Sequence, residues 1–367
     1  MRAKFLAVLL STLFAVVFME LALRLIYEPA PEWIEPQVRH DRSPLLGWVL
    51  PRNEKEAYTI DALVQTNSLG LRDDEIPLVK PEGEVRVLSL GDSFTFALGV
   101  EFDDLYVQKL ERQLNAVSDN ASFQVINAGV AGYNSRQERI YLLAQGLDLD
   151  PDLITVGFYW NDLIANEQPL PDLESIPLRS VEPELHGDGR GHALPSWLRN
   201  SLRRSLFLYT TVTRGKTAMA MLLGDPPQGS ARVQPALLSG DEEFLAPYWE
   251  ATAEHLQAIA AIGRERGIPV ILVAFPMENQ IRGQYDEMVW GEKLKAIWAP
   301  TGFPLIDLEA AYRDALNGGE NPFLPYDLHP GEHGMDLAAD SLYEVIVREQ
   351  LVDGVADAPL APTAESK

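Results

Sequence analysis

Two short stretches of the chain carry the serine, histidine and aspartate side chains that hydrolytic acyl transfer uses. Ser93 follows an apolar run, and Asp327 and His329 come just before the last predicted helix. A serine hydroxyl is a weak nucleophile until a base takes its proton, and a histidine can be that base because its pKa lies near neutral. A nearby carboxylate fixes the histidine tautomer and stabilises the imidazolium. These residue types are therefore candidates for a hydrolytic triad.

The run before the serine has the composition of a buried strand. Residues 85–90 are mostly apolar and β-branched, and the run breaks at Gly91, Asp92 and Ser93. Such a strand places the hydroxyl at the carboxyl edge of a sheet, where open α/β sheets bind ligands. A helix start there favours developing negative charge. Taken alone, the stretch also fits an ordinary turn with a capping serine.

Two further stretches offer hydrogen-bond donors. Residues 127–134 follow the second predicted strand, and their glycines, Gly129 and Gly132, allow close approach of a ligand and expose N–H groups. Asn161 follows the third predicted strand and offers a side-chain amide. The oxyanion of a tetrahedral intermediate needs such donors, since losing one costs roughly 2.7–4 kcal/mol in a well-studied enzyme.

Together these stretches resemble the SGNH (GDSL-like) hydrolase superfamily over residues 85–347, the insertion excluded. The first matching segment is Gly91-Asp92-Ser93-Phe94, and Gly132 aligns better than Gly129. The resemblance implies a flavodoxin-like α/β/α sandwich, with Ser93 as nucleophile, His329 as base and Asp327 as the third triad member. It also implies an oxyanion hole from the N–H groups of Ser93 and Gly132 and the side chain of Asn161. Residues 67–72 and 20–24 are similar to membrane-tethered bacterial members.

The sequence departs from the family pattern at two positions. Trp160 precedes Asn161, where the family often has glycine, and only Leu328 separates Asp327 from His329, where two residues are common. The second departure leaves Asp307 as a weaker substitute for Asp327. His333 lies four residues after His329, a possible metal spacing on a helix, but no third ligand is evident. We expect neither a metal nor a cofactor.

The pattern of the whole chain predicts an α/β fold. Strands and helices alternate from residue 85, which implies a parallel sheet with helices on both faces. The predicted strands are 85–90, 123–130, 153–158, 269–275 and 303–308, and the predicted helices are 105–114, 135–145, 248–266, 283–298 and 335–349.

The domain organisation follows from composition. Basic residues and a long apolar run predict a signal-anchor transmembrane helix at 1–27, with a cleaved signal peptide as the alternative. Residues 28–84 form a linker and a small β-rich lead-in, with short strands at 45–50 and 58–64. The hydrolase-like domain spans 85–350, and 351–367 is expected to be a disordered tail. An insertion after the third core strand, 167–247, carries a basic stretch at 197–223 and could be a substrate lid, a contact with membrane phosphates, or a solvated helix.

Bulk properties exclude several classes of function. The formal net charge of −24 in 367 residues argues against nucleic-acid binding. The absence of cysteine excludes disulfides, thiolate metal sites and cysteine nucleophiles.

These observations favour a serine esterase anchored in the inner membrane, with its catalytic domain on the periplasmic side. Its expected substrate is a small acyl ester, in the first instance an O-acetyl group on a cell-envelope or extracellular glycan. One alternative is an O-acetyltransferase that uses the same Ser-His pair and a membrane acyl-donor partner, since the two differ in water exclusion and acceptor binding. Another is a catalytically silent binding or scaffold protein of the envelope. It would gain support if Asp327 could not reach His329, or if Ser93 Oγ lay beyond about 4 Å from His329 Nε2.

Overall fold

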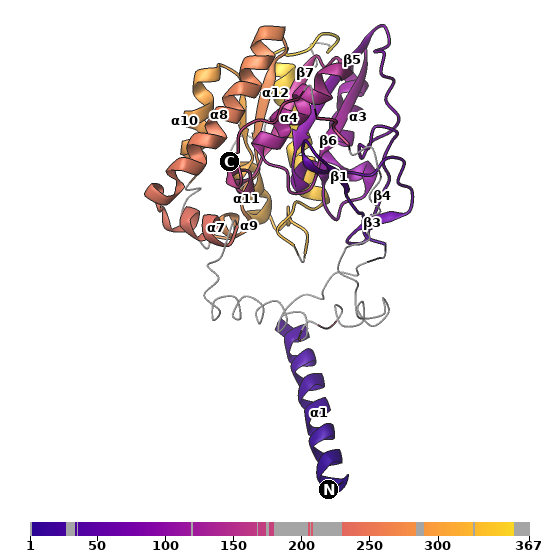
Figure 1. Cartoon of the computed structure of the whole chain (residues 1–367), viewed down its shortest axis with the longest axis vertical. Helices are drawn as coiled ribbons and strands as arrows, with labels where there is room; N and C mark the ends of the chain where they lie inside the picture. The colour runs from indigo at the N-terminus through magenta and orange to yellow at the C-terminus, as the bar shows by residue number, and fades with distance from the viewer. Residues whose placement is uncertain are drawn as a thin grey trace.

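The computed structural model describes residues 2–26, 34, 36–118, 120–166, 168–173, 176–179, 205, 207, 230–283, 290–325 and 327–355. Figure 1 shows one α/β body from which the N-terminal helix projects.

A parallel sheet forms the centre of the body. Its strands are β5 (Glu84–Gly91), β6 (Ser122–Gly129), β7 (Leu153–Phe158), β8 (Val270–Ala274) and β9 (Leu305–Asp307), and they pair in the order β6-β5-β7-β8-β9. Counted along the chain this is the order 2-1-3-4-5, the flavodoxin-like arrangement. The predicted parallel sheet is confirmed, and the order reverses beside β5, the strand that leads to Ser93.

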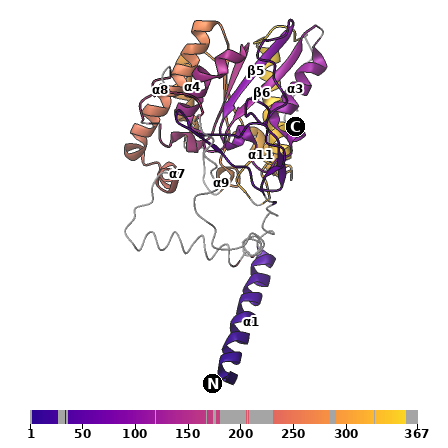
Figure 2. The same ribbon diagram turned by 45° about the vertical axis from the view of Figure 1, so that its right-hand side comes forward.

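Helices cover both faces of the sheet, as Figure 2 shows. On one face α3 (Tyr106–Val117) packs against α12 (Glu332–Arg348), and on the other α4 (Ser135–Ala144) packs against α8 (Glu242–Arg266). Between these two layers the β7 strand is buried along its whole length, as expected for a parallel sheet. Further helices in the described part of the chain are α7 (Ser230–Ser239), α9 (Glu278–Ile281), α10 (Gly291–Trp298), α11 (Glu309–Asn317) and the 3₁₀ turns Phe102–Asp104, Gly146–Leu149, Trp160–Leu163 and Ala299–Thr301.

Two predicted helices differ from the observed ones. The helix expected at 283–298 begins only at Gly291, and the separate short α9 ends before Gly283, which adopts a φ of +72° that a helix cannot continue. The helix expected at 248–266 begins earlier, at Glu242, because the side chain of Asp241 accepts the N–H of Phe244 at 3.2 Å and caps it.

The lead-in consists of two small hairpins. β1 (Asp41–Ser43) pairs with β2 (Gly47–Val49), and β3 (Ala57–Thr59) pairs with β4 (Ala62–Val64). The sequence predicts one strand at 45–50 and one at 58–64, whereas the structure has a two-stranded hairpin at each place. Both predictions are therefore wrong about the number and bounds of the strands. Gly47 takes a φ of +86°, and this turns the chain where a strand was expected. Leu50, Ile60 and Val64 are buried in the same core as the sheet.

The N-terminal helix α1 (Arg2–Ile26) lies apart from this core. Several of its large apolar side chains are exposed, among them Phe14 and Phe18. Among the described residues, no helix combines the length and apolar character that a membrane crossing demands. The expected transmembrane signal-anchor at 1–27 is thus not supported by the structure.

The insertion at 167–247 is described only in part. Its basic stretch at 197–223, apart from Ser205 and Phe207, and the tail beyond residue 355 lie outside the described residues. Where the insertion begins, it packs on the lead-in, since Arg179 donates to the carbonyls of Leu50 at 2.9 Å and Leu69 at 3.1 Å.

Candidate active site

The serine lies at a tight junction between β5 and α2 (Ser93–Phe96). A Cβ at Gly91 would lie 2.1 Å from Thr95 Oγ1, so only glycine fits at the end of the strand. Asp92 caps the helix, because its Oδ1 accepts the Phe94 N–H at 2.8 Å. The strand, the glycine and the cap together set the position of Ser93, which is 8% exposed.

The three residues expected to form a triad lie in one hydrogen-bonded chain. The distance from His329 Nε2 to Ser93 Oγ is 2.8 Å. His329 Nδ1 bonds Asp327 Oδ1, and this same oxygen accepts the His329 backbone N–H at 3.1 Å. With Nδ1 as the donor to Asp327, Nε2 is free to accept the serine proton. The one-residue spacing is therefore no obstacle to the contact between Asp327 and His329.

The electrostatics of the pair favour this arrangement. Burial by itself would raise the pKa of Asp327, but hydrogen bonds and charge interaction with His329 overcome it and hold the pKa below its ordinary value. Asp327 thus remains a carboxylate at neutral pH. Phe94 packs beside the imidazole, with 4.9 Å between ring centroids, and so limits the orientation of His329.

The two alternative assignments do not lie in this chain. Asp307 contacts Lys295 Nζ at 3.3 Å and accepts the Glu309 N–H at 3.1 Å. His333 Nε2 lies 3.0 Å from Glu320 Oε2. In the part of the chain that the structure describes, no group of His, Cys, Asp or Glu is arranged to hold a metal ion.

Asn161 reaches the site from the 3₁₀ turn that follows β7. Its Nδ2 donates to Asp92 Oδ2 at 2.9 Å, and Ser93 Oγ lies 3.4 Å from the same oxygen. An amide nitrogen carries two hydrogens, so one remains for a ligand. Asp92 thereby links the helix of the serine to the amide that was expected to stabilise an oxyanion.

The two glycines after β6 have different surroundings. A Cβ at Gly129 would lie 2.3 Å from Phe96 N, so this glycine allows the strand to pack on α2. Gly132 takes a φ of +81° in a turn and is partly exposed, with the ring of Trp48 beside it. The geometry therefore favours Gly132 as the residue that can present an N–H to a ligand.

Two carboxylates, Glu138 and Asp162, are fully buried near Asp92. Burial raises their pKa values well above the ordinary range, and the mutual repulsion of the acidic groups adds to this. Neither oxygen of Glu138 has a hydrogen-bond partner among the described residues. Sequence analysis gave neither residue a role, although Asp162 directly follows Asn161 in the stretch after the third strand.

A separate cavity of about 780 Å³ opens at the amino edge of the sheet, away from Ser93. Its lining includes Glu84, Asp150 and Arg266.

Comparison with protein families matches residues 89–337 to the GDSL-like lipase/acylhydrolase family. This is more than half of the chain, and it includes every residue of the expected triad and oxyanion hole. The chain belongs to this family. Members of the GDSL-like family are esterases or lipases, which agrees with the predicted superfamily and with an acyl-removing enzyme in general terms.

Solved structures similar to this GDSL-like chain are distant in sequence. TesA is 15% identical, with 73% of this chain and 99% of TesA covered and a TM-score of 0.41. A catalytic mutant of an acetylxylan esterase from Geobacillus stearothermophilus is 17% identical, with 71% and 94% covered and a TM-score of 0.41. A lipase/acylhydrolase from Enterococcus faecalis is 17% identical, with 71% and 95% covered and a TM-score of 0.39. No curated protein matches the sequence.

The lead-in supplies contacts to the site that sequence analysis missed. Trp48 Nε1 donates to Ala131 O at 3.0 Å, and Tyr133 OH donates to Trp48 O at 2.7 Å, so Trp48 binds the chain on both sides of Gly132. Arg72 reaches the far end of α2. The glycine-rich turn and the 67–72 stretch were noted as segments, but nothing local in either indicates these partners.

Proposed function

We propose that this protein is a serine ester hydrolase that removes a small acyl group, O-acetyl in the first instance, from a cell-envelope or extracellular glycan. The observation that carries the esterase proposal is the hydrogen-bonded chain from Ser93 Oγ through His329 to Asp327. The acetyl group and the glycan come from the sequence-based expectation and define the first substrates to test.

The proposed reaction begins with proton transfer. Ser93 Oγ attacks the ester carbonyl carbon while its proton passes to His329 Nε2, and Asp327 stabilises the imidazolium that forms. The N–H groups of Ser93 and Gly132 and the Asn161 amide would bind the oxyanion.

Collapse of the intermediate breaks the ester C–O bond, and His329 returns the proton to the leaving alcohol. This leaves the acyl group on Ser93. Water then attacks the acyl-enzyme with His329 again as base, which releases the acid and restores Ser93.

The silent-scaffold alternative has lost its main support. It would follow from a separation of Ser93 from His329, whereas the two side chains are 2.8 Å apart. The transferase alternative shares the same acyl-enzyme and differs only in the acceptor, so it becomes an outcome of the test.

Hydrolysis of p-nitrophenyl esters from acetate to decanoate tests the proposal. We expect turnover to be fastest with acetate and to fall by at least about 10³-fold in Ser93→Ala, with little change in Tm. The control is Ser341→Ala, a serine on α12 whose Oγ donates to Leu337 O at 2.7 Å. Equal turnover of Ser93→Ala and wild type would refute the nucleophile. Acyl transfer to an added sugar that exceeds hydrolysis would favour the transferase.

The cellular location remains a proposal from residues 1–27, for which the structure supports no membrane span. We propose the inner membrane, with the catalytic domain on the periplasmic side. Protease added to intact spheroplasts would digest the domain if this is correct, and would leave it whole if it lies in the cytoplasm.

A further inference from the structure

The helix that begins at Ser93 is too short to be stable alone. α2 has four residues, Ser93–Phe96, whereas isolated helices need roughly 12–15 residues to be even marginal in water. The last carbonyls of any helix lack partners within the helix. Asp92 caps the first turn of α2, and something must therefore bind its last turn.

Arg72 provides that contact from the lead-in. Its Nη1 donates to Phe96 O at 2.9 Å and to Ala97 O at 2.8 Å. Its Nη2 donates to Val100 O at 2.6 Å and to Leu63 O at 3.1 Å. One guanidinium thus ties the end of α2 and the turn after it to strand β4. A cation at this end of a helix also interacts favourably with the helix dipole.

The backbone at the end of α2 is held by two donors. Ala97 O accepts the Val100 N–H at 3.3 Å and also the Arg72 guanidinium. Ala97 ends α2 in the left-handed region, with a φ of 59° and a ψ of 69°, a conformation that costs a non-glycine residue free energy. The hydrogen bond from Arg72 to Ala97 O helps to offset the free-energy cost of this left-handed conformation. It also fixes the orientation of the Ala97 carbonyl. The planar fork of arginine fits several carbonyls at once, which a lysine ammonium does not.

Burying the guanidinium of Arg72 costs the folded protein free energy. Its side chain is fully buried, and all four of its acceptors are uncharged carbonyl oxygens. Burial lowers the pKa of Arg72 to about 10, so it stays a cation at neutral pH. Burying this charge is unfavourable, and the attraction of Glu101 offsets the effect of burial only in part. The fork of donors to four carbonyls indicates that Arg72 serves the geometry of α2.

We propose that Arg72 is a positioning residue for Ser93, acting through the carbonyls of Phe96 and Ala97 to fix α2 and with it the hydroxyl and N–H of Ser93. The inference rests on the proposed function in so far as it takes Ser93 to be the nucleophile.

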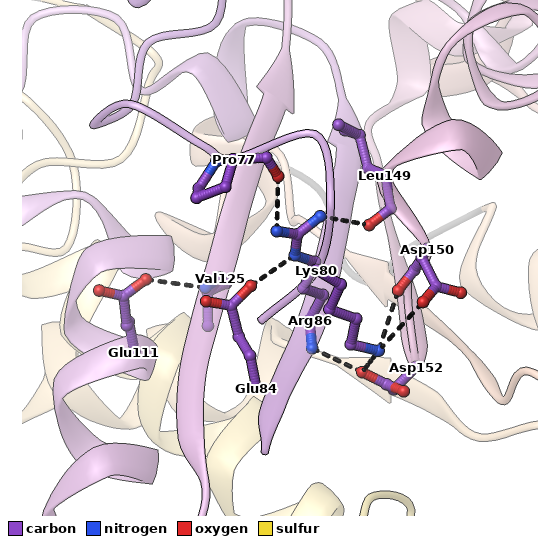
Figure 3. Close-up of polar contacts among 9 residues, drawn as sticks. All are labelled: Pro77, Lys80, Glu84, Arg86, Glu111, Val125, Leu149, Asp150 and Asp152. Carbon is purple, nitrogen blue, oxygen red and sulfur yellow. Dashed lines mark hydrogen bonds and ion pairs between the residues drawn. The ribbon is translucent and has the colours of Figure 1, made fainter. Parts of the chain in front are cut away.

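The chain offers a matched control in Arg86, a second fully buried arginine. Figure 3 shows its guanidinium at the opposite end of β5, where it pairs with Glu84 at 2.6 Å and donates to Pro77 O and Leu149 O. Arg72→Met and Arg86→Met each remove one buried guanidinium, but only the first touches α2.

The first measurement is amide hydrogen exchange in the full chain, which requires no activity. The Phe96 N–H bonds Asp92 O, and the Leu98 N–H bonds Ser93 O, so both amides report on α2. We expect their exchange to be at least about tenfold faster in Arg72→Met and within about threefold of wild type in Arg86→Met. Unchanged exchange in Arg72→Met would overturn the inference.

The second measurement is hydrolysis of p-nitrophenyl acetate well below each Tm. Arg72→Met should lower kcat at least about tenfold with KM within about threefold, because positioning acts on the transition state. Arg72→Lys keeps the charge but not the forked set of donors, so its kcat should lie between those of wild type and Arg72→Met. If Arg72→Met does not fold, Arg72→Lys takes its place in both measurements. An equal loss of kcat in Arg86→Met would indicate general loosening and overturn the inference. A wild type that hydrolyses no ester would remove the proposed function, while the exchange measurement would still test Arg72.

Discussion

The two ends of strand β5 use the same residue type in opposite ways. At the amino edge of the sheet Arg86 is neutralised by Glu84, and its neighbour Lys80 lies 2.5 Å from Asp152 (Figure 3). At the carboxyl edge Arg72 binds carbonyls alone, beside the helix of Ser93. The amino edge therefore pairs its charges with opposite charges, whereas at the carboxyl edge the Arg72 guanidinium donates to the carbonyls that end α2. Substitutions at the two edges should separate stability from catalysis.

The largest difference between an effect on catalysis and an effect on stability is expected for substitutions of two aspartates, Asp327 and Asp152. Asp327→Asn replaces the carboxylate that fixes the His329 tautomer with a neutral amide, whose NH₂ can favour the wrong tautomer, and the same change in a serine protease costs about 10⁴-fold in kcat. We expect a loss of about 10³–10⁴-fold in kcat for p-nitrophenyl acetate, with Tm nearly unchanged.

The partner variant is Asp152→Asn, at the amino edge. Asp152 accepts from Lys80 and from the Arg86 N–H at 2.7 Å, so its loss should lower Tm and leave kcat within about twofold. If Asp327→Asn kept wild-type kcat, Asp327 would not be the orienting carboxylate.

A second pair compares two asparagines. Asn161→Ala removes the amide that we propose binds the oxyanion, so kcat should fall about 10²–10³-fold while KM changes little. Asn115 binds both the N–H and the carbonyl of Phe123 near the amino edge, and Asn115→Ala should lower Tm without affecting kcat. The comparison fails if both variants lose kcat by the same factor.

The smallest effect concerns the pH dependence of stability. The raised pKa of buried Glu138 means that the folded state holds a proton that the unfolded state releases above its ordinary pKa of 4.5. The contribution of Glu138 to stability is therefore fully present below that pH and is lost as pH rises toward its folded-state pKa. Glu138→Gln should flatten the decline in Tm between acidic and alkaline pH by a few degrees.

Glu111→Gln is the control for that measurement. Burial also raises the pKa of Glu111, but its Oε2 accepts the Val125 N–H at 2.8 Å, as Figure 3 shows. Glutamine keeps an oxygen that can accept this N–H. The hydrogen bond favours the carboxylate and so limits the rise in the pKa of Glu111. Glu111→Gln should therefore flatten the decline in Tm less than Glu138→Gln does. A pH profile of Tm that is the same in Glu138→Gln and wild type would show that Glu138 does not hold the proton.

The central sheet could be predicted from the sequence because its signals are local. Each of its strands is an apolar run bounded by turn residues, and the triad residues stand directly beside recognisable breaks, as at Gly91. The lead-in was predicted less well, because the φ of Gly47 and the pairing of short strands depend on the surface beneath them. The role of Arg72 could not be predicted, since its acceptors lie at residues 63, 96, 97 and 100 and meet only after folding.

The position of Arg72 also determines which part of the chain could be transferred to another protein as a working unit. The family match covers residues 89–337, so the guanidinium that binds α2 comes from outside the segment that defines the family. A chimera that carried only this segment onto another protein would take the Arg72 guanidinium away from the carbonyls of Phe96 and Ala97. If Arg72 positions Ser93 as proposed, the smallest portable unit of this protein is larger than the segment that defines its family, and grafting it requires the hairpins of the lead-in as well.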